Sequence, residues 1–297
     1  EVSIDTIEPE HYPGTPISAD ALRSIADRLA SAKKPLIWAG GGVNLSGAWE
    51  ELQRVAETLT APVILTREGK GAMPDSHPLT MMMGIGNQGA APELMPEADV
   101  IFTVGSRFNI PQDADWAPKP HQTFIHLDID ETELQNNVIP TIGVVADAKI
   151  GLGQIADAIR GANIESSWDK DVLSAKKKAD QEAMRERTPQ FSQAYQVWEE
   201  VRNNLPEETI VVGGVTGGSQ FAGSAFATLR PRTVISSSYM GTLGYGFPTA
   251  LGVKVGNPDT PVLALVGDGG LMYAIGELAT AVHYGINLVT VIFNNHR

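Results

Sequence analysis

Short apolar runs, many of them rich in β-branched residues, alternate with amphipathic helical stretches along most of this chain. In the first half these runs predict strands over residues 35–40, 62–66, 100–105, 123–128 and 143–147, with helices over 48–59 and 150–159. Runs that are apolar throughout, rather than alternating, are typical of parallel strands whose two faces are both covered by helices. We therefore expect an α/β domain with a parallel sheet.

The second half repeats this rhythm. Apolar runs predict strands over 209–213, 233–237, 262–266 and 288–293, and helical patterns cover 192–203 and 271–284. The fold class we expect is α/β, with two doubly wound parallel-sheet domains. The last strand would form a sheet edge that nothing further covers, so we expect the second domain to be incomplete at its C-terminus.

A highly charged stretch separates the two halves. The expected organisation is a first α/β domain over 1–165, a helical connector over 166–190 and a second α/β domain over 191–297. The charges of the connector could form a surface for a partner or the solvated face of an interdomain helix. We favour the solvated helix, because charge runs of this kind usually face water.

Composition narrows the classes of function. The chain has 297 residues, a net charge of −13 and no cysteine. An acidic chain is a poor partner for nucleic acid, and no apolar run approaches the ~20 residues of a membrane span. The absence of cysteine excludes disulfides and thiolate metal sites and agrees with a cytoplasmic location. An acidic protein that binds phosphate needs local help from backbone N–H groups, a helix N-terminus or a cation.

One motif provides such help. Gly267-Asp268-Gly269-Gly270 follows the strand 262–266, and Asn294-Asn295 follows the strand 288–293, so strand, helix and strand form one βαβ unit. A right-handed crossover brings both strand ends to the same sheet edge, where Asp268 and Asn295 could meet. Their oxygens suit Mg²⁺, and the glycines let backbone approach a phosphate. The motif favours a diphosphate ligand; an ordinary turn with a capping aspartate is the alternative.

This motif resembles the cofactor-binding motif of thiamine-diphosphate-dependent enzymes, in which Gly-Asp-Gly precedes a helix, an apolar strand and Asn-Asn. The resemblance implies that Mg²⁺ is held by Asp268, Asn295 and the backbone carbonyl of Arg297. It also implies that Gly267, Gly269 and Gly270 lie close to the diphosphate.

A second segment, residues 240–252, looks like the part of this family that cradles the aminopyrimidine ring of the cofactor. The resemblance implies that Leu243 is the apolar residue that forces the cofactor to bend, and that the carbonyl of Gly241 accepts a hydrogen bond from the 4′-amino group. The bent shape brings that amino group to C2 of the thiazolium, where it can take the proton. Ordinary core packing is the alternative role for Leu243.

The glycine-rich turn over residues 213–220 could add diphosphate contacts through Gly217 and Gly218. Acetolactate synthases usually carry Gly-Gln-His-Gln at this point, whereas this chain reads Thr216-Gly-Gly-Ser-Gln220. A turn of purely structural meaning is the alternative.

The first half resembles the central domain of the same family, which binds FAD in acetolactate synthase. Four segments fall where that domain touches its nucleotide: residues 40–42, 105–108, 128–130 and 146–148. Flavin-binding members typically continue with Asp-Asp-Arg after the Arg-Phe, but this chain has Asn109-Ile110-Pro111, so FAD and an empty or vestigial site stay open. Residues 84–89 fit a dinucleotide pattern, yet 80–83 is a poor first strand and no acidic residue follows at the expected distance, so we reject NAD.

The resemblance implies a carboligase or decarboxylase of 2-oxo acids, most like acetolactate synthase, which converts pyruvate to acetolactate. Another thiamine-diphosphate enzyme, such as an oxidase, a glyoxylate carboligase or an acyl transferase, is one alternative, and a non-catalytic scaffold is the other. The family's activating glutamate comes from a separate domain of the neighbouring subunit, so we assign no catalytic residue here. We expect a homodimer or homotetramer with the site at the subunit interface, and an inactive chain when these 297 residues stand alone.

Overall fold

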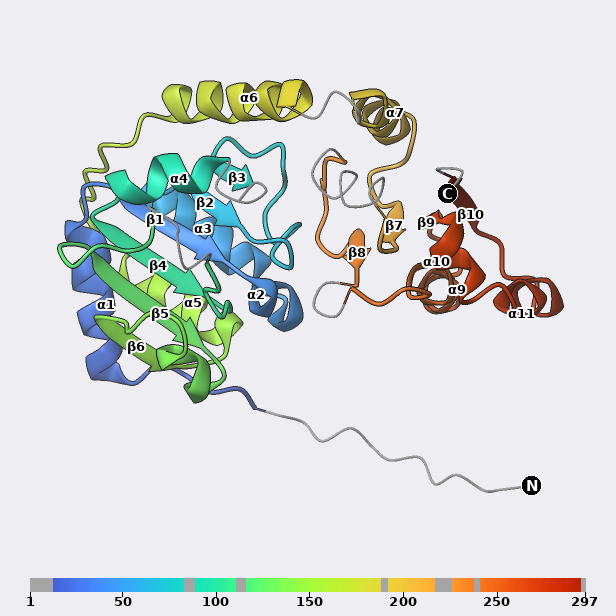
Figure 1. Ribbon diagram of the computed structural model, residues 1–297. Helices are drawn as coiled ribbons and strands as arrows, with labels where there is room; N and C mark the ends of the chain where they lie inside the picture. Colours follow the sequence, from blue (N-terminus) through green and yellow to red (C-terminus); the bar gives the residue numbers. More distant parts are fainter. Residues whose placement is uncertain are drawn as a thin grey trace.

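The chain forms two separate parallel sheets joined by a helical connector (Figure 1). The computed structural model describes residues 13–82, 89–110, 116–187, 192–216, 226–237 and 241–294. Each sheet packs against its own buried apolar residues. The expected fold class, with two doubly wound α/β units, is confirmed.

The first sheet has six strands in the order β3-β2-β1-β4-β5-β6, all parallel. They are β1 Pro35–Ala39, β2 Val63–Leu65, β3 Thr80–Met82, β4 Val100–Val104, β5 Thr123–Asp128 and β6 Ile142–Val145. Our judgement that the segment from Thr80 makes a poor strand was wrong, because these residues form the edge strand β3. An edge strand needs a partner on one side only, and pairing with β2 outweighs weak local propensity.

Helices cover both faces of this sheet. They are α1 Ala19–Ser31, α2 Gly41–Ser46, α3 Trp49–Leu59, α4 Ala90–Leu94 and α5 Ala148–Ala158, with 3₁₀ turns η1 Met95–Glu97 and η2 Glu131–Gln135. Helices α1, α3 and α5 pack against one another, whereas α4 lies on the opposite face (Figure 1). The side chain of Asp147 accepts hydrogen bonds from the N–H groups of Lys149 and Ile150 and so caps α5.

The second sheet has the order β10-β9-β7-β8, again all parallel. Its strands are β7 Ile210–Gly213, β8 Val234–Ser236, β9 Val262–Gly267 and β10 Val289–Phe293, and its helices are α9 Gly246–Gly256, α10 Asp268–Met272 and α11 Glu277–His283. The parallel pairing of β9 with β10 confirms the βαβ unit. The single helix expected over 271–284 was wrong, because a turn separates α10 from α11. No residue of α11 is buried, so the packing that would sustain a longer helix is missing.

The connector contains α6 Lys170–Arg187, which leads from the first sheet to α7 Ser192–Asn203 at the start of the second half (Figure 1). The expected helix is present, but it is docked rather than merely solvated. Leu173 is buried in the first core, Lys176 pairs with Glu93, and Lys177 donates to backbone carbonyls of the first sheet's loops. Within the described ranges, every helix lacks either the length or the apolar run that a bilayer crossing needs.

Candidate functional site

The carboxyl ends of β7 and β9 form the natural binding crevice of the second sheet. Strand β8 lies on one side of β7 and strand β9 on the other, so the chain reverses its direction across the sheet at this point. Ligands of open parallel sheets bind outside the carboxyl ends of the strands at such a reversal. Gly214 follows β7 there and donates a hydrogen bond to the carbonyl of Leu265 (2.7 Å), while Asp268 follows β9 directly.

Asp268 is the first residue of α10, and the backbone that follows it is accessible. The preceding N-cap residue, Gly267, offers no side chain to the first N–H groups of the helix. A Cβ added at Gly269 or Gly270 would meet no atom within 4 Å, so a ligand can approach the backbone there. Because α10 has only five residues, its dipole is shorter than that of the helix we expected. The uncapped N–H groups of its first turn are therefore the main attraction for an anion.

Register places the end of β10 beside this turn. Phe293 pairs with Gly267, so Asn294 and Asp268 both lie one residue beyond the last pair, at the same sheet edge. The predicted ligands Asn295 and Arg297 lie outside the described residues, and so do Gly217 and Gly218. Among the residues that the structure describes, no group of three or more His, Asp or Glu side chains could hold a metal ion. A cation at Asp268 would thus depend on one carboxylate together with neutral oxygens, which suits Mg²⁺ when phosphate and water complete the shell.

The turn at 241–246 reaches the same edge. Gly241 (φ 54°) and Gly244 (φ 84°) both adopt the left-handed backbone that favours glycine, and they flank Leu243. A Cβ on Gly244 would lie 3.0 Å from the Cβ of Tyr273, which follows α10. Leu243 is 46% exposed, so its side chain is not a core residue.

Sequence reasoning missed one neighbour of the motif. The side chain of Thr216 lies against Gly267, where a Cβ would be 3.2 Å from the Cβ of Thr216. This contact joins the loop after β7 to the first residue of the Gly-Asp-Gly motif. The only signal in the sequence was the place of Thr216 in the glycine-rich turn.

The nucleotide-like residues of the first sheet also gather at one edge, because they follow β1, β4, β5 and β6. The order of strands reverses between β1 and β4, and there the two loops touch. The N–H of Gly42 donates to the carbonyl of Gly105 (2.9 Å), and a Cβ on Gly40 would overlap that same carbonyl oxygen. Only glycine fits this contact. The loops after β1 and β4 are therefore in direct backbone contact at this reversal.

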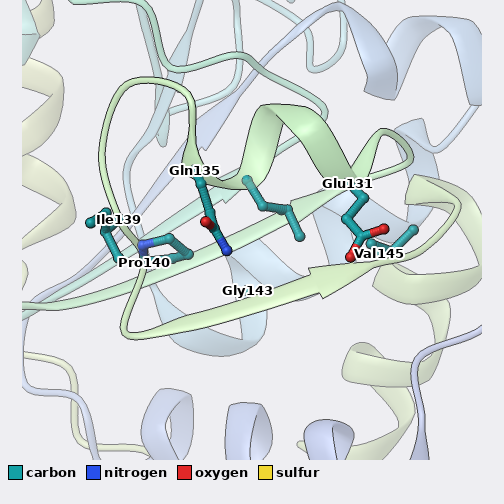
Figure 2. A pocket seen from close by; sticks show the side chains of 7 residues that line it. Glu131, Gln135, Ile139, Pro140, Gly143 and Val145 are labelled. Carbon is teal, nitrogen blue, oxygen red and sulfur yellow. The ribbon is translucent and has the colours of Figure 1, made fainter.

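A pocket of about 320 Å³ lies at the far side of the first sheet, between η2 and β6. Figure 2 shows Gln135, Ile139 and Pro140 above the strand, and Glu131 beside Val145. Asp130 precedes this wall, and hydrogen bonds from the side chain and backbone of Thr132 lower the pKa of its carboxyl. The pocket borders the nucleotide-like segments at β6, and Figure 1 shows β6 in the first sheet, far from α10 in the second half. It adds nothing to the diphosphate site.

Two family descriptions match the sequence of this chain. Residues 22–155 match the model "Thiamine pyrophosphate enzyme, central domain", and residues 215–297 match "Thiamine pyrophosphate enzyme, C-terminal TPP binding domain". Together they cover more than half of the chain, which therefore belongs to the thiamine pyrophosphate (thiamine diphosphate) enzyme family.

Particular relatives narrow the comparison. A protein named "Probable acetolactate synthase large subunit" from Methanococcus aeolicus is 35% identical over 90% of this chain and 47% of its own length. The acetolactate synthase large subunit of Lactococcus lactis is 30% identical over 97% of this chain and 50% of that protein. A sulfoacetaldehyde acetyltransferase from Castellaniella defragrans is 30% identical over 95% of this chain and 52% of that protein. The chain spans about half the length of these relatives.

A solved structure agrees on the fold. The X-ray structure of a protein described as a thiamin diphosphate-dependent enzyme from Mycobacterium smegmatis superposes with a TM-score of 0.77. It is 20% identical, and the match covers 97% of this chain and 55% of that one. At this identity the likeness speaks for the arrangement of helices and strands alone.

Proposed function

We propose that this chain is part of a thiamine-diphosphate- and Mg²⁺-dependent 2-oxo acid carboligase or decarboxylase, most like acetolactate synthase. One observation carries the proposal: Asp268 stands at the strand reversal of the second sheet, followed by open backbone N–H groups. The acetolactate synthase names of the relatives support the reaction type.

The residues of this site fit the cofactor by the chemistry of their donors. Asp268, with Asn295 and the carbonyl of Arg297, would hold Mg²⁺, and the cation would neutralise the diphosphate in an acidic protein. Backbone N–H groups at Gly267, Gly269 and Gly270, with Gly217 and Gly218, would contact the diphosphate itself. When bound, the cofactor supplies a carbon nucleophile and an electron sink.

Two residues of the 241–246 turn would set the shape of the cofactor. The half-exposed Leu243 is available to support a bent cofactor from below, and the Gly241 carbonyl would accept the hydrogen bond of its amino group. Bending and orientation are what such residues contribute, because they bring the proton acceptor to the reacting carbon.

The remaining groups would come from outside these residues. The family's activating glutamate has no counterpart here, and the relatives are about twice as long as this chain. Large apolar side chains on α11 and directly after it are exposed, among them Val282 and Tyr284. Such a surface supports a homodimer or homotetramer with the site at the subunit interface. The two family matches and the two sheets support the division of the chain into 1–165, 166–190 and 191–297. We expect turnover only in the complete assembly.

An acyl transferase is the second candidate. The relative from Castellaniella defragrans is an acetyltransferase at similar identity, and the Thr216-Gly-Gly-Ser-Gln220 loop departs from the usual synthase pattern. Assaying the full-length assembly with pyruvate alone, and then with an added acyl acceptor, separates the two activities. The flavin bands in the absorbance spectrum of the purified protein decide whether the first sheet binds FAD.

Calorimetric titration with thiamine diphosphate tests the proposal. We expect binding with Mg²⁺ and its loss with EDTA. Asp268→Asn should weaken Mg²⁺-dependent binding at least tenfold, because one charged ligand is removed. Asp259→Asn, at an exposed turn before β9, is the matched control and should bind like the parent. Equal binding with and without Mg²⁺, or no binding by the full-length protein, would overturn the assignment.

A further inference from the structure

The two halves of the chain touch through Asp75, in the loop after β2, and Thr228, in the segment before β8. The N–H of Asp75 donates to the carbonyl of Thr228 (2.8 Å), and the N–H of Thr228 donates to Oδ2 of Asp75 (2.7 Å). Thr228 is almost fully buried. A Cβ on Gly71 would lie 2.9 Å from Cγ2 of Thr228, so the loop backbone packs directly on this residue. The contact is therefore close and mutual.

A buried charge pair fixes Asp75 in this place. Nζ of Lys70 lies 2.7 Å from Oδ2 of Asp75, and the two side chains are 5% and 10% exposed. A buried ion pair gives little net stability, but either charge alone is strongly unfavourable. Asp75 is thereby held in the one position in which Lys70 and the Thr228 N–H share the same oxygen.

The connector helix closes on the same loop. Nζ of Lys177, on α6, donates to the backbone carbonyls of Asp75 and His77. Burial lowers the pKa of Lys177, while the charge of Asp75 raises it and that of Lys70 lowers it. First sheet, connector and second sheet thus meet around one carboxylate.

The side-chain hydroxyl of Thr228 has no part in this contact. Its Oγ1, and likewise Oδ1 of Asp75, is buried and has no hydrogen-bond partner among the residues that the structure describes. The link between the halves therefore runs through Asp75 Oδ2 and the two backbones, and removal of the hydroxyl should leave it intact.

We propose that Asp75 is a positioning residue that holds the second sheet in a fixed position relative to the first. We call its contact with Lys70 and Thr228 the lock. The chain that leads into Thr228 is the connection from β7, which carries Gly217 and Gly218 in its sequence and in which Thr216 touches Gly267. Fixing Thr228 anchors the far end of that connection, so the lock supports the diphosphate site from the other sheet. The effect on the cofactor rests on the proposed function, whereas the lock itself does not.

These 297 residues contain no cysteine, so spin labels can be placed in them at chosen positions to measure the lock. Ser24→Cys on α1 and Val255→Cys on α9 place spin labels at exposed positions of the two halves. Pulsed electron paramagnetic resonance should give a narrow distance distribution in this doubly labelled parent. Asp75→Asn should broaden it, because the neutral amide oxygen accepts more weakly than a carboxylate and leaves the charge of Lys70 buried without a counter-charge. Lys70→Met/Asp75→Leu should broaden it as well without leaving a buried charge, which keeps the test valid if the single variant folds poorly.

Two controls match these variants. Asp99→Asn changes an aspartate that also accepts backbone hydrogen bonds, from Lys33 and Lys34, but within the first half of the chain. Thr228→Val replaces only the hydroxyl with a methyl group and keeps the Cγ2 that packs on Gly71. Both should keep the narrow distribution. An unchanged distribution in the Lys70→Met/Asp75→Leu variant would overturn the lock.

Cofactor binding separates this inference from the proposed function. Asp75→Asn should weaken Mg²⁺-dependent binding of thiamine diphosphate roughly tenfold, the size expected for losing a charged hydrogen bond. Asp75→Glu, which restores the charge, should recover part of that affinity. If the parent binds no thiamine diphosphate, the proposed function fails and the distance measurement still decides the lock. Normal affinity in a variant with a broadened distribution would refute the link to the cofactor.

Discussion

Gly246 lies so close to Gly214 that a Cβ on Gly246 would be 2.9 Å from both N and Cα of Gly214. The first turn of α9 is thereby pressed onto the loop that leaves β7. The same Cβ would also be 2.8 Å from Cγ1 of Val266, in the strand that ends before Asp268. Helix, loop and motif strand are packed against one another at the edge where the cofactor would bind.

Gly246→Ala should therefore destabilise the protein by about 1–3 kcal/mol, because the methyl group meets backbone that cannot move aside. Gly252→Ala is the matched control in the same helix, since a Cβ there meets no atom within 4 Å. That change should be neutral or stabilise by about 0.5–1 kcal/mol through helix propensity. Urea denaturation of the two variants measures both effects. Equal free energies of unfolding would contradict the packing described here.

Leu243→Ala and Leu251→Ala distinguish a cofactor support from a core residue. Leu243 is 46% exposed and Leu251 only 4%. Leu251→Ala should cost about 2–5 kcal/mol of stability, whereas Leu243→Ala should change the stability of the cofactor-free protein little. In the full-length enzyme Leu243→Ala should instead slow the exchange of the C2 proton of bound thiamine diphosphate, measured by NMR after quenching in D₂O. Unchanged exchange would remove Leu243 from the site.

A charge placed on the exposed apolar surface of α11 should weaken self-association. Val282 is 83% exposed on α11, and Val255 is 63% exposed on α9. Val282→Lys should weaken self-association of the full-length protein without loss of fold, because it places a charge in an interface of buried apolar side chains. Val255→Lys is the control of similar exposure. Sedimentation velocity measures the result, and identical association of both variants would move the interface elsewhere.

The sequence pattern predicted the local elements well, because buried parallel strands are apolar at every position. The predicted strand over 123–128 coincides with β5 Thr123–Asp128, and the predicted helix over 192–203 coincides with α7. The failures have physical causes. Strand β3 depends on pairing with β2, and the break between α10 and α11 reflects packing that the sequence does not display.

The candidate site followed the same division. The place of Asp268 at the carboxyl end of β9 was predictable because a strand–turn–helix motif is local, and parallel strands bring their carboxyl ends together; its role as a ligand stays a prediction. Two contacts could not be predicted, because each joins segments far apart in the sequence: Thr216 with Gly267, and Asp75 with Thr228. No periodicity reports which loop of one sheet will touch the other.

His126, on β5, should make stability depend on pH. Its Nε2 lies 2.8 Å from the carbonyl oxygen of Ser106, so Nε2 carries the proton, and within the described ranges the buried Nδ1 has no hydrogen-bond partner. Burial lowers the pKa of His126, opposed by the Ser106 carbonyl and by the charges of Asp128 and Glu133. Below the ordinary histidine pKa of about 6.5, the unfolded chain binds a proton that the folded protein does not.

The free energy of unfolding should therefore fall as pH decreases from about 6.5 toward the lower pKa of the folded state, by at most about 1.4 kcal/mol per pH unit. Above that range the contribution is fully present. His126→Gln should remove this part of the pH dependence, while His121→Gln, at an exposed position, should retain it. Urea midpoints between pH 5 and pH 8 measure the difference in the free energy of unfolding between each variant and the parent. Groups that titrate in the same way in both proteins cancel in this difference. Parallel curves for His126→Gln and the parent would show that His126 is protonated equally in the folded and unfolded states.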